Sequence, residues 1–172
     1  RLTDGEEYPA MIIGSDAVSD LAVLYIECNG LTPATFGNSD SLRVGDAVAA
    51  IGDPLGVELR GTMTDGIISA INRDVTISGG GTMTLIQTNA ALNSGNSGGP
   101  LFNMNGEVVG IITAKYSGSS GNGISIEGLG FAIPIDDVAG MIMDLQQFGY
   151  VTGPYLGVYV LDVDPVAQSY GL

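Results

Sequence analysis

One serine in this chain has neighbours that favour nucleophilic chemistry. Ser97 lies in the run Asn93-Ser94-Gly95-Asn96-Ser97-Gly98-Gly99-Pro100, with three glycines and a proline close to it. Because glycine adopts positive φ freely, such a loop can turn sharply and direct backbone amides at one point. An exposed hydroxyl beside amides of this kind is what a serine nucleophile with an oxyanion hole requires. A glycine-rich turn between strands has the same composition, and the spacing alone leaves both interpretations open.

The sequence contains no histidine, which restricts the chemistry available to Ser97. Gly95-Asn96-Ser97-Gly98-Gly99 matches the nucleophile-elbow pattern, but that motif needs a helix directly after the serine and a histidine downstream. A subtilisin-type order needs a histidine between the aspartate and the serine, and none is present. A Ser–Lys pair could use only Lys115, which has no evident burial to activate it. The order His…Asp…Ser remains, with Asp20 as the aspartate and the histidine expected upstream of Arg1.

Asp20 comes directly before the apolar run Leu21-Ala22-Val23-Leu24-Tyr25-Ile26, which has the length of a strand. A carboxylate at the entry to a strand is often a solvated turn residue. It could equally orient a histidine, as the aspartate of a catalytic triad does. The residues around Asp20 do not decide between these two roles.

The composition favours a strand-rich domain of 172 residues with many tight turns. Glycine is abundant at 27 residues, charged residues make up 14% and apolar residues 45%; the length suits one domain, or one domain plus a piece of another. The net charge of −14 and only five basic residues argue against nucleic acid or an anionic membrane as a partner. Cys28 is the single cysteine, which excludes an internal disulfide. No apolar run approaches ~18 residues, and no cofactor or metal is expected.

Periodicity predicts several strands and one helix. Gly66 inside one expected strand indicates a bend or bulge, and Gly79-Gly80-Gly81 marks a hairpin tip. The expected strands cover residues 8–13 (ending at Gly14), 21–26, 46–52, 62–72, 82–88, 101–102, 107–114, 130–134 and 155–160. After the strand at 130–134, Ile135, Val138, Met141, Ile142, Leu145 and Phe148 share one helical face. Asp136 and Asp137 suit the start of this helix, and Gly149 suits its end.

Colinear segments over most of the chain resemble the HtrA (Deg) family of serine proteases. They are Gly14 to Asp16, Ser19 to Leu24, Phe36 to Asp40, Val44 to Asp46, Ala50 to Gly56, Thr64 to Ser69, Ile86 to Pro100 and Gly128 to Pro134. Two positions depart from the family pattern. Asn89 stands where many relatives carry aspartate, and Ser94 where proline is frequent; both are interpreted as tolerated loop variation.

The resemblance implies an all-β fold of the trypsin/chymotrypsin-like double-barrel type. The first barrel is expected to be incomplete and the second intact, followed by one C-terminal helix. The implied divisions are residues 1–35 for the remainder of the first barrel, 36–134 for the second, 135–150 for the helix and 151–172 for a linker and the start of a truncated PDZ domain.

The resemblance also implies roles for particular residues. Ser97 would be the nucleophile and Asp20 the orienting carboxylate, while the Gly95 and Ser97 amides would form the oxyanion hole, with Asn96 between them. The substrate pocket would involve Asn93, Leu129, Gly130, Phe131 and Ala132. Residues 53–63 would match a regulatory loop near the active site. Tyr155, Leu156, Gly157 and Val158 look like the carboxylate-binding loop of the PDZ domain.

The implied function is a serine endopeptidase that acts on unfolded or misfolded polypeptides in protein quality control. The expected location is the bacterial cell envelope, periplasmic or secreted. The resemblance leaves open whether a membrane anchor lies upstream and whether the protein forms a homo-oligomer. Because no residue here can accept the Ser97 proton as a histidine would, the chain alone is expected to be inactive. The alternative is a non-catalytic, chaperone-like module that binds peptides with the same fold.

Overall fold

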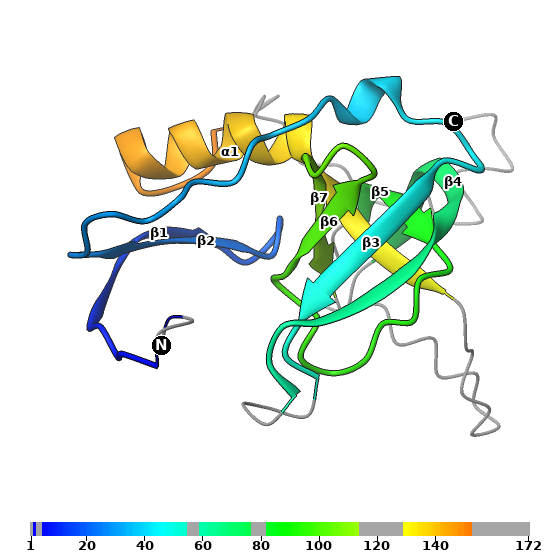
Figure 1. Ribbon diagram of the computed structural model, residues 1–172. Coiled ribbons are helices and arrows are strands. Elements are labelled where there is room, and N and C mark those ends of the chain that lie inside the picture. The colour runs from blue at the N-terminus through cyan, green and yellow to red at the C-terminus, as the bar shows by residue number, and fades with distance from the viewer. Residues whose placement is uncertain (1, 3–4, 55–58, 77–81, 114–128, 153–172) are drawn as a thin grey trace, which may run out of the picture.

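The structure is a computed structural model that describes residue 2 and residues 5–54, 59–76, 82–113 and 129–152. It consists of a two-stranded hairpin, a closed barrel and one helix (Figure 1). The elements in chain order are β1 (Ala10–Asp16), β2 (Leu21–Ile26), a 3₁₀ turn (Ser39–Ser41), β3 (Ala47–Gly52), β4 (Thr62–Thr76), β5 (Thr82–Thr88), β6 (Pro100–Asn103), β7 (Val108–Thr113), β8 (Gly130–Pro134) and α1 (Ile135–Phe148).

The barrel is closed by six antiparallel strands in the order β3-β4-β5-β8-β7-β6. Pairing of β3 with β6 completes the ring, so the barrel has no unpaired edge strand. Apolar side chains from the strands, together with Leu42 and Ala90 from the connecting segments, fill its interior. They are Leu42, Val48, Ala50, Ile68, Ile86, Ala90, Leu101, Val109, Ile112 and Ala132. The expected intact second barrel, and with it the trypsin-like fold class, is confirmed.

Helix α1 packs on the outside of this barrel and forms a second apolar cluster there. Phe131 and Ile133 of β8 contact this cluster, whereas Ala132 between them faces the barrel interior. Strand β8 is therefore buried on both faces, which explains its uninterrupted apolar sequence. The helix ends as predicted at Gly149, which has a φ of 78° and donates its amide to the Leu145 carbonyl at 3.0 Å.

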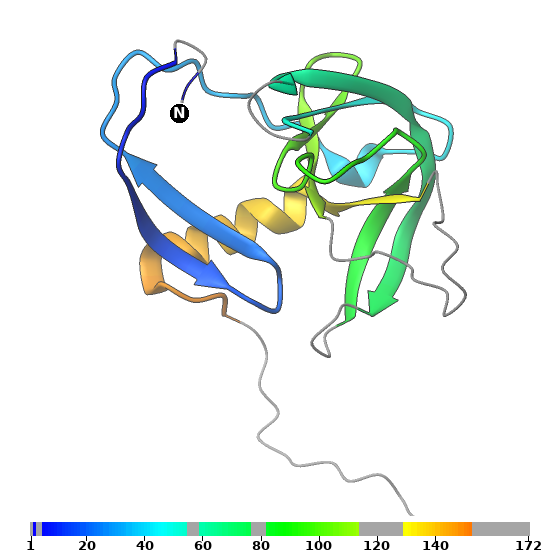
Figure 2. The same cartoon turned by 90° about the horizontal axis from the view of Figure 1, so that it is seen from below.

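The β1–β2 hairpin lies beside the barrel, and α1 extends from the barrel to the hairpin (Figure 2). The prediction that the first strand ends at Gly14 is wrong, because β1 continues to Asp16. Gly14 instead allows close contact with the end of α1, since a Cβ there would lie 2.8 Å from the Leu145 carbonyl oxygen. Large apolar side chains on the hairpin remain exposed, Ile12 by 72%, as expected of an incomplete first barrel.

Strand β4 is longer than predicted, and its irregularity lies elsewhere than at Gly66. The register with β5 shifts between Ile68 and Ala70 and again before Arg73, where Asn72 has a φ of 53°. Gly66 is regularly paired with β3, and its missing side chain accommodates Ala90, whose nitrogen would lie 2.5 Å from a Cβ. The predicted hairpin tip at residues 79–81 and the strand at 155–160 lie outside the described residues.

The first turn of α1 is tied to the 3₁₀ turn through Asp136. One of its carboxylate oxygens accepts hydrogen bonds from the Ser39 hydroxyl and amide, both at 2.7 Å, and from the Asp40 amide at 3.3 Å. The Ser39 hydroxyl, with the two amides adding to it, lowers the pKa of Asp136. At the next position, burial raises the pKa of Asp137, with smaller contributions from Asp40 and Asp136. The pKa values of these two adjacent carboxylates are therefore shifted in opposite directions.

We expect Asp136→Asn to destabilise the chain at pH 7 by about 1 kcal/mol more than Asp137→Asn, a modest difference because Asp136 is an exposed residue. Both variants lose a negative charge at the start of the helix. Only Asp136→Asn also loses the charged carboxylate that accepts hydrogen bonds from Ser39. Because the folded pKa of Asp136 is lowered, its contribution is present above about pH 4 and is lost as the pH falls through the folded pKa. Thermal unfolding of both variants from neutral to acidic pH measures this contribution. A difference in stability between the two variants that does not change with pH would contradict the prediction.

Candidate active site

Ser97 is exposed in the second of two consecutive turns on the loop that joins β5 to β6. The Asn96 amide donates to the Asn93 carbonyl at 3.0 Å, and the Gly99 amide donates to the Asn96 carbonyl at 3.0 Å. The Gly98 amide donates to a carbonyl of β7 at 2.8 Å, which anchors the second turn to the barrel. The tight turns therefore present Ser97 to solvent on a rigid support.

Not every amide of this loop is used by the loop itself. Among the described residues, the Gly95 and Ser97 amides donate to no acceptor, whereas those of Asn96, Gly98 and Gly99 all do. Gly95 and Gly98 have φ of 105° and 80°, a conformation that other residues rarely adopt. The Gly95 and Ser97 amides, on either side of Asn96 in the sequence, are thus both open. Open amides beside an exposed hydroxyl are the arrangement an oxyanion hole requires.

The loop packs directly on the backbone that follows β3. The Asp53 amide donates to the Gly95 carbonyl at 3.1 Å, and a Cβ on Gly95 would collide with the Asp53 carbonyl. Gly52 allows the same close approach, because a Cβ there would lie 2.6 Å from Oδ1 of Asn96. The Asn96 side chain is 1% exposed and donates through Nδ2 to the Ala91 carbonyl at 3.4 Å. Asn96 therefore supports the loop from inside rather than facing solvent.

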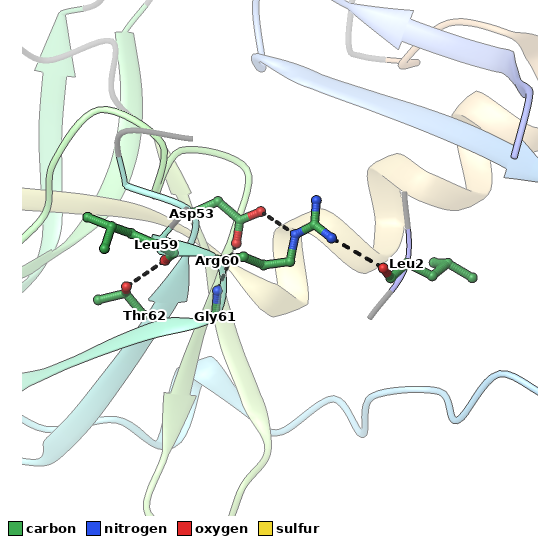
Figure 3. A network of polar contacts seen from close by, with 6 residues as sticks. All are labelled: Leu2, Asp53, Leu59, Arg60, Gly61 and Thr62. Carbon is green, nitrogen blue, oxygen red and sulfur yellow. Dashed lines mark hydrogen bonds and ion pairs between the residues drawn. The ribbon is translucent and has the colours of Figure 1, made fainter. Parts of the chain in front are cut away.

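Asp53 also joins a polar network that reaches the N-terminal segment (Figure 3). Its carboxylate accepts from the Gly61 amide at 2.9 Å and from Nε of Arg60 at 3.3 Å. Arg60 in turn donates through Nη1 to the Leu2 carbonyl at 3.2 Å. The ends of the segment predicted as a regulatory loop are thus connected to the support of Ser97; residues 55–58 lie outside the described part.

Asn89, at one of the departures from the family pattern, has a clear structural role. Its Oδ1 accepts a hydrogen bond from the Ile67 amide at 2.8 Å, which ties the start of the Ser97 loop to β4. An asparagine oxygen can accept this bond as an aspartate oxygen can. This hydrogen bond gives a physical reason why asparagine is tolerated at position 89.

Asp20 lies at the end of the β1–β2 turn and carries unusual backbone geometry. Its φ is 60°, a left-handed conformation that is uncommon outside glycine and is frequently found at functional sites. Its Oδ2 accepts a hydrogen bond from the Thr113 hydroxyl at 3.0 Å. Thr113 ends β7 and is 6% exposed, so this bond links the hairpin to the barrel. No sequence signal singled out Thr113, because its partner is 93 residues away.

Asp20 and Ser97 line the same cavity, which has a volume of about 490 Å³. Its walls come from β2, β7, β8 and α1 and are mainly apolar. The other lining residues are Leu21, Ala22, Val23, Leu24, Gly98, Ile111, Ile112, Thr113, Ile133, Val138 and Ile142. The fold therefore brings together Asp20 and Ser97, the two residues that the sequence predicts as triad members. They are 77 positions apart in the chain.

The five residues predicted for the substrate pocket are not among those that line this cavity. Phe131 and Ala132 are buried in the two apolar clusters, while Gly130 packs closely against Leu92. The Asn93 carbonyl accepts the hydrogen bond that closes the first turn of the Ser97 loop. Leu129 is 38% exposed. Tyr155, Leu156, Gly157 and Val158 lie outside the described residues.

The described residues offer no metal site and no membrane-spanning helix. No group of three or more histidine, cysteine, aspartate or glutamate side chains could hold a metal ion there. No helix in the same part of the chain is long and apolar enough to cross a membrane.

A closed six-stranded barrel with an exposed serine on a glycine-rich loop defines the class of trypsin-like peptidase domains. A family model described as "Trypsin-like peptidase domain" matches residues 1–111. The serine protease Do-like HtrA of Bacillus subtilis is 46% identical over 98% of this chain and 37% of its own length. A probable periplasmic serine endoprotease DegP-like from Halomonas elongata is 43% identical over 99% of this chain and 35% of its own length.

Solved structures agree with the sequence relatives. The HtrA-type protease AlgW with decapeptide superposes with a TM-score of 0.83 at 42% identity, covering 99% of this chain and 51% of that chain. The chain belongs to the HtrA family of serine proteases. It spans little more than a third of the length of the curated relatives it matches.

Proposed function

We propose that the protein is a serine endopeptidase in which Ser97 attacks the scissile carbonyl. The Gly95 and Ser97 amides stabilise the oxyanion that forms, and Asp20 orients the base that takes the serine proton. The observation that carries this proposal is the shared cavity. An exposed serine, whose loop carries the open Gly95 and Ser97 amides, and the carboxylate of Asp20, whose backbone is left-handed, line one cavity.

This assignment leaves one catalytic role without a residue in the chain. The sequence has no histidine, so no imidazole side chain can take the Ser97 proton. Loss of one triad member leaves only the catalysis that comes from the oxyanion hole and binding. The 172-residue chain by itself is therefore proposed to be inactive, and the full-length gene product to supply a histidine from upstream.

Unfolded or misfolded polypeptides are the proposed substrates, and protein quality control in the cell envelope is the proposed setting. Relatives from Halomonas elongata and Haemophilus influenzae are named as probable periplasmic proteases, which supports the location. Asn93 and residues 129–132 are proposed to shape the substrate pocket, and residues 155–158 to belong to a PDZ domain. Assembly into a homo-oligomer is part of the same proposal.

The test compares casein hydrolysis by the full-length gene product with that of its Ser97→Ala variant. Hydrolysis that depends on Ser97 is the expected result, since alanine removes the nucleophile and leaves the exposed loop otherwise unchanged. Equal hydrolysis by the two proteins would show that Ser97 is not the nucleophile.

A peptide-binding module without catalysis is the second candidate, and the lack of histidine in the chain favours it. In that case the full-length protein binds unfolded polypeptide but hydrolyses no casein, with or without Ser97. The same experiment therefore separates the two functions.

A further inference from the structure

Two asparagine–glycine pairs lie in exposed bends of the described part of the chain and share a backbone conformation. Asn29-Gly30 follows β2, and Asn105-Gly106 belongs to the turn between β6 and β7. Both asparagines are exposed, and Gly30 and Gly106 have φ of 79° and 77°. A Cβ on either glycine would meet no atom within 4 Å. The two pairs differ in their hydrogen bonds. A third pair, Asn122-Gly123, lies outside the described residues.

The Asn105-Gly106 turn is fixed by hydrogen bonds on both sides. The Gly106 amide donates to the Asn103 carbonyl at 3.1 Å. Oδ1 of Asn103 accepts from the Asn105 amide at 2.9 Å and from the Glu107 amide at 3.0 Å. The Gly106 nitrogen is therefore committed to an acceptor, and a rotation of the backbone beside it would break further hydrogen bonds.

The Gly30 amide has no such commitment. Among the described residues it donates to no acceptor, and the Asn29 side chain makes no hydrogen bond. The hydrogen bonds of this bend come from Cys28, whose amide donates to the Ile26 carbonyl at 3.1 Å and whose Sγ donates to the Asn29 carbonyl at 3.7 Å. Neither bond holds the Gly30 nitrogen, which leaves it free to approach the Asn29 carboxamide.

We propose that Asn29 is a site of spontaneous deamidation and that the fold protects Asn105 from the same reaction. The Gly30 nitrogen bonds to the side-chain carbonyl carbon of Asn29, and the carbon–nitrogen bond of the carboxamide breaks. The proton of the Gly30 amide passes through water to the departing amine, which leaves as ammonia. Water then opens the resulting five-membered succinimide ring at either carbonyl and gives aspartate or isoaspartate. The net reaction consumes one water and releases one ammonia.

Glycine hinders this attack less than any other residue, because no side chain shields its nitrogen. The product carries one more negative charge, and isoaspartate adds one carbon atom to the backbone between β2 and the barrel. The modification needs no enzyme and no contribution from Ser97. It is therefore independent of the proposed protease activity.

Deamidation is measured on the folded full-length gene product, which is aged in mildly alkaline buffer and then digested with trypsin. Because the chain has only five basic residues, the three pairs fall on separate peptides, which are residues 2–43, residues 74–115 and a peptide that begins at residue 116. Mass spectrometry detects the replacement of the amide NH₂ by OH, and fragment ions locate the residue. We expect Asn29 to deamidate about tenfold faster than Asn105 or more, the factor that corresponds to one hydrogen bond on the attacking nitrogen.

The same measurement in denaturant separates the effect of the fold from that of the local sequence. In the unfolded chain water solvates both glycine amides, so the rates at Asn29 and Asn105 should become similar. Equal rates at the two residues in the folded protein would overturn the inference. A difference that persists in denaturant would also overturn it, because neighbours in the sequence would then be its cause.

Asn103→Ala is the matched variant, because it removes the Oδ1 acceptor of the protected turn and leaves the Asn29 bend unchanged. We expect it to accelerate deamidation at Asn105 by about threefold to tenfold and to leave the rate at Asn29 unaltered. If Asn105 reacts no faster in this variant, the Asn103 side chain does not restrict the turn, and the proposed protection is wrong.

Discussion

Replacing Asp20 with asparagine is expected to lower casein hydrolysis by the full-length gene product by about 10⁴-fold. An aspartate in this position holds the base in the correct tautomer and stabilises its charged form, and a neutral amide does neither. Asparagine is the appropriate replacement because it tolerates the left-handed φ of 60° at this position. Hydrolysis rates measured under saturating and limiting casein, together with thermal unfolding, test the prediction.

Thr113→Val provides the control for this prediction. It removes the hydroxyl that donates to Asp20 at 3.0 Å but keeps the carboxylate and the side-chain shape. We expect a loss of about tenfold, the equivalent of one hydrogen bond that positions a catalytic group. If Asp20→Asn falls no further than Thr113→Val, then Asp20 is a structural turn residue and not the orienting carboxylate.

Replacing Gly95 with alanine is expected to lower hydrolysis by about 10²- to 10³-fold, the usual effect of losing one oxyanion-hole donor. A Cβ at this position would collide with the Asp53 carbonyl, and alanine is also strained at a φ of 105°. The loop must therefore move, and the Gly95 and Ser97 amides move with it. Substrate affinity should change much less than turnover, because the oxyanion forms only in the transition state.

Gly98→Ala is the matched control on the same loop. Its φ of 80° causes similar backbone strain, but a Cβ there would meet no atom within 4 Å. Both variants should lose about 1 kcal/mol of stability from the strain alone. A loss of turnover in Gly95→Ala that exceeds the loss in Gly98→Ala at least tenfold supports the oxyanion role. Equal losses would show that general loop strain, and not displaced amides, causes the effect.

Elements that depend on local chemistry could be predicted from the sequence. Alternating apolar residues and glycine-rich turns predicted most strands, and the one-sided apolar pattern predicted α1 with its end at Gly149. The glycines around Ser97 marked it as a candidate nucleophile, and the absence of histidine set the limit on what Ser97 can do alone. These features depend on neighbours in the chain, so they can be recognised without a fold.

Only the tertiary structure decided which distant residues meet. Gly14 and Gly66 carry no local signal that distinguishes a bend from a close contact, and both turned out to accommodate backbone from distant segments. Thr113 reaches Asp20 across 93 positions, and which amides of the Ser97 loop stay open depends on the acceptors that the fold places near them. Closure of the barrel and packing of α1 against the hairpin create the cavity that Asp20 and Ser97 share. Spacing in the sequence cannot show such contacts, because they depend on how the chain folds back on itself.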